Sequence, residues 1–182
     1  MTSGSSQAQL RTEPAGPQVL VQQESIDGLA AEWKTLLQSS LAGVPFLTPT
    51  WLMTWWRNFG RGHDQLVLSF RQRSRLAGIA PLMRTGDTLS FFALSDVCDY
   101  HDFLFPSGSE EGFFAALMSK LLEFPNWKRL QLEGLRERSP ALAFLPDVAR
   151  THNLSVTVTA EEASPHIPVA ATWDDYLAAL DK

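Results

Sequence analysis

The densest group of side chains able to do acid–base chemistry lies between residues 96 and 102. Its members are Asp96, Cys98, Asp99, Tyr100, His101 and Asp102. One of these carboxylates could act as a general base toward an amine, with the Tyr100 hydroxyl as the acid. His101 with Asp99 or Asp102 could also bind a metal, but zinc requires four ligands and the neighbouring sequence offers no others. The Cys98 thiol is a poor nucleophile, because nearby negative charge disfavours the thiolate.

Asp99, Tyr100 and Asp102 are therefore candidates for a substrate cleft. Glu133 joins them because it precedes Gly134 at the end of an expected strand. A structural interpretation stays open for each residue: Asp99 can accept backbone hydrogen bonds in a turn, and Glu133 can be an ordinary carboxylate at a strand end. No catalytic role is assigned, and the sequence predicts neither a metal site nor cofactor-binding residues in this chain.

Positive charge is concentrated in residues 57–84, which carry six arginines and one acid, Asp64. Arg71, Arg73 and Arg75 alternate around an expected hairpin turn, so they are either solvated surface charges or contacts to an anionic ligand. The whole chain has a net charge of −5 and a pI near 5.3. A chain of this charge is not expected to bind nucleic acid.

The first part of the chain predicts a strand followed by two helices. Residues 1–17 have a single large apolar side chain and are expected to be a disordered tail. A strand is expected at 19–21, and Ser25 is the expected N-cap of a helix that follows. Thr48 and Pro49 begin a second helix that ends at Gly60.

A run of antiparallel strands is expected next, at 66–70, 76–83, 88–94 and 100–105. In the first of these, alternating apolar residues predict one face toward the core. Gly78 and Pro81 predict that the second is bulged or edge-like at its end.

The last part of the chain predicts alternating helices and strands. A helix at 109–124 should begin with a capping box of Ser107 and Glu110. Strands are expected at 130–132 and 154–158, with a further extended piece at Ile167 and Val169. Between the two strands, Ser139 and Pro140 should begin a helix.

A short helix beginning at Thr172 is the last expected element. It places Trp173, Tyr176, Leu177 and Leu180 on one face. A helix of this length needs a partner surface to be stable. We therefore expect an apolar surface that binds another domain or another copy of the chain.

Length and composition favour one globular domain of mixed α/β (α+β) class. With 182 residues and 10% aromatic residues, the chain can bury a substantial core. The single cysteine excludes an internal disulfide. No apolar run reaches membrane-spanning length and no signal peptide is evident, so we expect no membrane association and a cytoplasmic location.

A series of short motifs resembles the N-terminal half of the CelD-type, cellulose-biosynthesis-associated GNAT acetyltransferases. The series begins with Pro45 to Pro49, Trp51-Leu52, Trp55-Trp56 and Phe59-Gly60. It continues with Gly78 to Leu82, Asp99-Tyr100, Asp102-Phe103, Leu132 to Leu135 and Ser139-Pro140, and ends with Ser164-Pro165, Ile167-Pro168, Trp173 and Tyr176-Leu177. The resemblance runs from about Val44 to Lys182.

The resemblance implies a GNAT-like fold with a mixed, mostly antiparallel sheet flanked by helices, over residues 18–170. It implies acyl transfer from acetyl-CoA to an amine, with most of the machinery in a second GNAT-like half that the helix at 171–182 would lead into. Under this interpretation, the chain is a truncated enzyme or a stand-alone remnant. A non-catalytic GNAT-fold binding or assembly module is the alternative.

One departure from the family bears on acetyl-CoA. Family members that bind it carry a Gln/Arg-x-x-Gly-x-Gly/Ala turn before the third helix, where glycines expose N–H groups to the pyrophosphate. Here the stretch is Phe105 to Gly112, with no leading Gln or Arg, with Pro106 lacking an N–H, and with Glu110 and Glu111 at the helix start. We therefore expect that this half does not bind coenzyme A. We expect enzymatic activity only when this half is combined with its partner.

Overall fold

The chain is described from a computed structural model, over residues 19–40, 44–93, 97–161, 163 and 170–180. The expected tail at 1–17 and the expected extended piece at Ile167 and Val169 lie outside the described residues.

A five-stranded mixed sheet forms the centre of the fold, in the order β1-β2-β3-β4-β5. Its strands are β1 (Val19–Gln23), β2 (Asp64–Gln72), β3 (Arg75–Thr85), β4 (Thr88–Phe91) and β5 (Arg129–Gln131). The first four pair antiparallel in sequence order, and β5 pairs parallel with β4. The expected mixed, mostly antiparallel sheet is confirmed.

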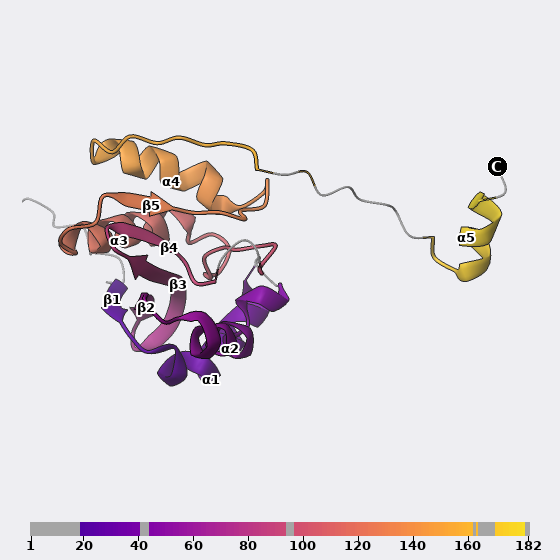
Figure 1. Cartoon of the computed structure of the whole chain (residues 1–182), viewed down its shortest axis with the longest axis horizontal. Helices are drawn as coiled ribbons and strands as arrows, with labels where there is room; N and C mark the ends of the chain where they lie inside the picture. Colours follow the sequence, from indigo (N-terminus) through magenta and orange to yellow (C-terminus); the bar gives the residue numbers. More distant parts are fainter. Residues whose placement is uncertain (1–18, 41–43, 94–96, 162, 164–169, 181–182) are drawn as a thin grey trace, which may run out of the picture.

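Helices cover both faces of the sheet (Figure 1). They are α1 (Ile26–Ser39), the 3₁₀ turn η1 (Pro45–Leu47), α2 (Pro49–Phe59), α3 (Glu110–Glu123), α4 (Pro140–Thr151) and α5 (Trp173–Leu180). One buried cluster joins α1 and α2 to the sheet, and a second joins α3 and α4 to it. The expected mixed α/β class is therefore confirmed.

Three helix starts confirm the capping residues expected from the sequence. Ser25 accepts a hydrogen bond from Asp27 N at the start of α1, and Thr48 accepts one from Trp51 N at the start of α2. Ser139 accepts one from Ala141 N at the start of α4. In each case the hydroxyl satisfies a backbone donor that the helix itself leaves unpaired.

The start of α3 differs from the expected capping box. Ser109 occupies the N-cap position and makes no side-chain capping bond. Glu110 Oε1 instead accepts a hydrogen bond from Gly108 N over 3.0 Å. The prediction for Ser107 was wrong because Gly108, at φ +86°, turns the chain so that α3 begins two residues later.

Strands β2 and β3 are more deeply embedded than their sequences indicate. In β2, Val67 and Ser69 are buried like Leu66 and Phe70 on the opposite face, because both faces are covered by helices. β3 is the central strand, so the edge-like interpretation of Pro81 was wrong. The expected bulge is present, since Ala77 has no partner between the pairs Phe70–Gly78 and Arg71–Leu76.

No regular strand forms at 100–105, where one was expected. β3 pairs with β4 through Leu82 to Thr85, and farther along with Leu104, which exchanges two backbone hydrogen bonds with Ile79. The pairing alongside β3, which we call the β4 line, is thus interrupted after Phe91 and resumes at Leu104. The chain between these points includes His101, which forms an isolated parallel bridge with Leu135.

The expected strand at 154–158 is also absent. Leu154 and Val156 are half-buried against the core beside α3 and α4, while Ser155 and Thr157 are exposed. The apolar alternation that predicted a strand therefore reflects packing of an extended chain on that core, without pairing to the described strands.

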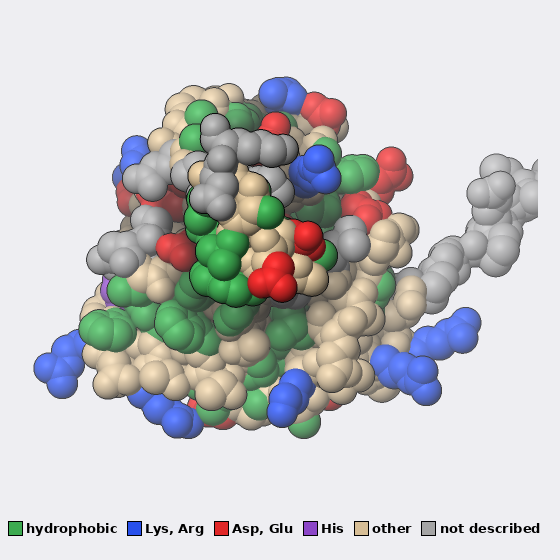
Figure 2. Space-filling model, turned by 90° about the vertical axis from the view of Figure 1, so that its right-hand side faces the viewer, with side chains coloured by type: hydrophobic (Ala, Val, Ile, Leu, Met, Phe, Trp, Pro, Cys, Tyr) green, Lys and Arg blue, Asp and Glu red, His purple; other side chains and the backbone are tan. Residues whose placement is uncertain are grey.

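The short C-terminal helix α5 is present and stands apart from the sheet (Figure 1). Thr172 Oγ1 accepts a hydrogen bond from Asp175 N at its start. No residue of α5 is buried, and Trp173 and Leu180 are 68% and 63% exposed. Figure 2, which views the molecule from the side of α5, shows hydrophobic and acidic side chains together on this helix.

Candidate functional site

The structure brings the two sequence-predicted parts of the candidate site together. His101 N donates a hydrogen bond to Gly134 O over 3.0 Å. The segment carrying Asp99, Tyr100 and Asp102 therefore lies beside the turn that carries Glu133. Their exposure differs: Asp99 is exposed, Tyr100 and Glu133 are partly buried, and Asp102 is buried.

Asp102 is held by two hydrogen bonds within the protein. Its Oδ1 accepts from Phe103 N over 2.9 Å and from the Ser139 hydroxyl over 3.0 Å. Burial raises the pKa of Asp102, an effect that these two hydrogen bonds and the positive charge of Arg136 oppose. With 3% of the residue exposed, the carboxyl can reach a substrate only if the segment opens.

His101 is the most constrained titratable residue near the candidate site. Its ring stacks on Phe91 with centroids 5.5 Å apart and planes at 11°. Nδ1 donates to Glu133 O over 3.2 Å, while Nε2 is buried without a hydrogen-bond partner. Burial lowers the pKa of His101. The sequence placed His101 in the group but carried no signal of this burial.

Asp99 is exposed and Glu133 is partly buried, and neither lines the groove between α3 and α4 that is described below. The Glu133 carboxylate accepts a hydrogen bond from Gln131, the last residue of β5. Gly134 N donates to Glu161 Oε2 over 3.0 Å, so a second acid lies at the same turn. Two acidic side chains, Glu133 and Glu161, thus lie at the turn at 133–134, and Arg136 follows it.

An open groove of about 460 Å³ lies between the starts of α3 and α4. Its charged lining residues are Glu110, Glu137 and Arg138, and Leu142 and Phe144 provide an apolar wall. Ser139 lines this groove and hydrogen-bonds Asp102 behind it. Because the Ser139 hydroxyl also accepts a hydrogen bond from Ala141 N, it caps the start of α4 while it donates to Asp102.

The start of α3 does not fit the pyrophosphate of coenzyme A. The Gly108 N–H already donates a hydrogen bond to the Glu110 carboxylate. The Ser109 hydroxyl donates to Pro106 O over 2.6 Å, so it faces the backbone. Glu110 and Glu111 both lie in the first turn of α3, and their negative charge repels a phosphate group at this position.

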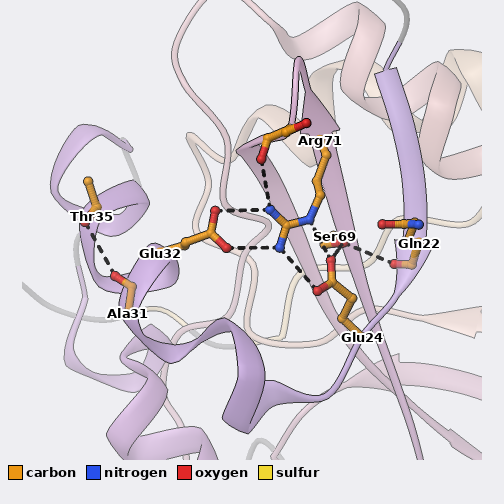
Figure 3. Close-up of polar contacts among 8 residues, drawn as sticks. Gln22, Glu24, Ala31, Glu32, Thr35, Ser69 and Arg71 are labelled. Carbon is orange, nitrogen blue, oxygen red and sulfur yellow. Dashed lines mark hydrogen bonds and ion pairs between the residues drawn. The ribbon is translucent and has the colours of Figure 1, made fainter.

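Arg71 belongs to a separate ion-pair network that joins β2 to the segments before and within α1 (Figure 3). Its Nε and Nη2 donate to the two carboxylate oxygens of Glu24 at 2.8 and 3.2 Å. Its Nη1 and Nη2 donate to Glu32 at 3.1 and 3.0 Å. Arg71 therefore fits neither interpretation of the arginine cluster, because its guanidinium is paired with the protein's own carboxylates. Arg73 and Arg75 are exposed, as the surface-charge interpretation expects.

The single cysteine is part of the core. Cys98 is 1% exposed, and its sulfur accepts a hydrogen bond from Trp51 Nε1 over 3.1 Å. This location agrees with the expectation that Cys98 is not a nucleophile, because a reactive thiolate requires partial exposure and positive surroundings.

In the described part of the chain, no group of three or more His, Cys, Asp or Glu side chains is arranged to hold a metal ion. None of the helices within those residues is long and apolar enough to span a membrane. No family model, curated protein or solved structure matches the chain.

Proposed function

We propose that this chain is a scaffold half of a GNAT-type N-acyltransferase. In this proposal, it shapes the cleft and binds a second GNAT-like domain that carries the acyl-CoA site. The motif series from Pro45 to Leu177 supports the relationship. The element order also supports it, with antiparallel strands followed by a helix and a parallel strand.

The start of α3 carries the proposal that this half does not bind the acyl donor. A diphosphate bound at a helix start needs free N–H groups and no competing negative charge. Here the Glu110 carboxylate already accepts the hydrogen bond from Gly108 N. The protein's own carboxylate thus takes the place that an anionic ligand would need.

The exposed face of α5 supports the second part of the proposal, binding of another domain. The face consists of Trp173, Tyr176, Leu177 and Leu180, from 38% to 68% exposed. Two α5 helices packed together would bury about 800 Å² in total, at the limit of crystal-contact size. Both copies would also bring Asp174 and Asp175. A second domain with a larger, less acidic surface therefore fits better than another copy of this chain.

Thermal unfolding with acetyl-CoA tests the first part. A ligand at one hundred times its Kd adds about 2.7 kcal/mol, which raises Tm by about 5–10 °C in a chain of this size. We expect no shift at about 1 mM acetyl-CoA for the wild type. A shift of several degrees in the wild type would overturn the proposal. A still larger shift in E110K would locate the coenzyme at the start of α3, because that substitution removes the carboxylate that competes with the pyrophosphate.

Sedimentation equilibrium tests the choice of partner. We expect a monomer at about 50 µM. A concentration-dependent dimer that W173A abolishes would instead identify the partner of α5 as a second copy.

A non-catalytic binding or assembly module is the second candidate. The structural use of Asp102 favours it, since that carboxyl supports the start of α4 and is buried. The gene downstream of the Lys182 codon distinguishes the two: a frame encoding the Gln/Arg-x-x-Gly-x-Gly turn favours the acyltransferase half, and its absence favours the module.

A further inference from the structure

The His101 side chain packs where the chain leaves β3 after Phe91, before pairing with β3 resumes at Leu104. Its ring lies between Phe91, on which it stacks, and the turn at Gly134. Gly134 has φ +69°, and a Cβ built on it would lie 2.9 Å from His101 Nδ1. The imidazole therefore occupies the space that any larger residue at 134 would need.

The hydrogen bonding of this ring fixes where the proton of its neutral form lies. Nδ1 donates to Glu133 O, so Nδ1 carries the proton of the neutral imidazole. Nε2 is buried with no hydrogen-bond partner. A proton added to Nε2 would place a positive charge where water cannot reach it, and charged groups are costly to bury without compensation.

We propose that His101 is a pH-sensitive latch, whose neutral ring holds residues 97–102 against the turn at 133–135 and whose protonation releases that segment. The inference rests on these contacts and is independent of the proposed acyltransferase relationship.

The charged groups around His101 do not cancel the cost of protonation. Glu133, two residues after β5, and Glu161 from the C-terminal segment favour the charged ring, as do the carbonyl oxygens of Glu133 and Phe92. Asp99 and Asp102 lie on its own segment, and Arg136 follows the facing turn. Desolvation outweighs the favourable contributions, so the pKa of His101 is lowered.

Release is expected to be local, because two other contacts hold the same segment. Asp102 Oδ1 is bound to Ser139, and burial keeps its pKa high, so acid does not add a charge there. Leu104 exchanges two backbone hydrogen bonds with Ile79 of β3, at 2.7 and 3.0 Å. These anchors contain no group that gains charge on acidification.

Amide hydrogen exchange on the full chain tests the latch with an internal control. The His101 amide donates to Gly134 O and reports the latch, while the Leu104 amide donates to Ile79 O and reports the anchor. Between pH 7.5 and 5, after correction for intrinsic rates, we expect protection of the His101 amide to fall about tenfold per pH unit below the ordinary histidine pKa. Protection of the Leu104 amide should stay constant.

Two variants separate the latch from a general effect of acid. H101N keeps a side-chain donor without a charge change in this range, so the His101-position amide should lose its pH dependence. H152Q removes an exposed histidine and should leave the wild-type response unchanged. If H101N fails to fold, the imidazole titration of the wild type, followed by NMR, replaces it.

Three results would overturn the proposal. They are equal loss of protection at the amides of residues 101 and 104, unchanged protection at both, and titration of the His101 ring at an ordinary pKa without any change in its amide.

Discussion

Asp102 and Ser139 are joined by a hydrogen bond of 3.0 Å between two residues that are both buried. This contact ties the segment that continues the β4 line to the start of α4. The same serine hydroxyl accepts from Ala141 N over 3.1 Å, so one side chain satisfies a buried carboxyl and a helix end.

We expect S139A to lower the free energy of unfolding by about 2–3 kcal/mol, since it removes a helix cap and a partner of a buried carboxylate. Urea denaturation measures the change. S109A is the control, because Ser109 occupies the N-cap position of α3 without a capping bond. A similar loss in both variants would contradict a special role for the Asp102–Ser139 pair.

The raised pKa of Asp102 predicts a definite pH dependence. The folded state binds this proton more tightly than the unfolded state, so the residue's contribution to stability is largest at acidic pH. That contribution declines as pH rises from the ordinary aspartate pKa, about 3.9, through the higher folded value. D102N cannot ionise, so its stability relative to wild type should increase from pH 4 to pH 7. D147N, at an exposed position, should show no such trend.

Arg71 is expected to stabilise the docking of α1 through its two carboxylate partners. R71K keeps the charge but loses the paired geometry, so we expect a loss of about 1–3 kcal/mol in urea denaturation. R73K should be neutral, because that side chain is exposed. Equal effects of the two substitutions would argue against the network.

The same network predicts acid sensitivity. Hydrogen bonds from Arg71 lower the pKa of Glu24 and Glu32. Their contribution to stability is therefore present above the ordinary glutamate pKa, about 4.3, and is lost as pH falls through the lowered folded values. The double variant E24Q/E32Q should be less stable than wild type at pH 7, and the difference should shrink toward pH 3. A difference independent of pH would contradict this assignment.

Gly134 is expected to tolerate no side chain. G134A combines a left-handed backbone with a contact of 2.9 Å to His101 Nδ1, so it should destabilise by more than 2 kcal/mol. G86A is the matched control, since Gly86 has φ +62° and open space around its Cβ position. It should lose only the backbone part, about 1–2 kcal/mol.

The sequence by itself predicted the helices well, because their signals are local, whereas the strands expected at 100–105 and 154–158 do not form. Ser25, Thr48 and Ser139 cap helices as expected. The apolar stripe of α5 also follows from neighbouring residues. The acidic start of α3 was visible in Glu110 and Glu111.

The tertiary structure decided which of these residues meet, and no spacing in the sequence encodes that. Pro81 suggests an edge by its missing N–H, yet β3 is central; the proline is accommodated there because the pairing with β4 is interrupted beside it. Arg71 alternates like a surface residue, yet Glu24 and Glu32 approach it from 47 and 39 residues away. The burial of His101 depends on Phe91 and on a glycine 33 residues downstream. Capping and periodicity act within a few residues, whereas burial and charge pairing depend on how distant segments pack.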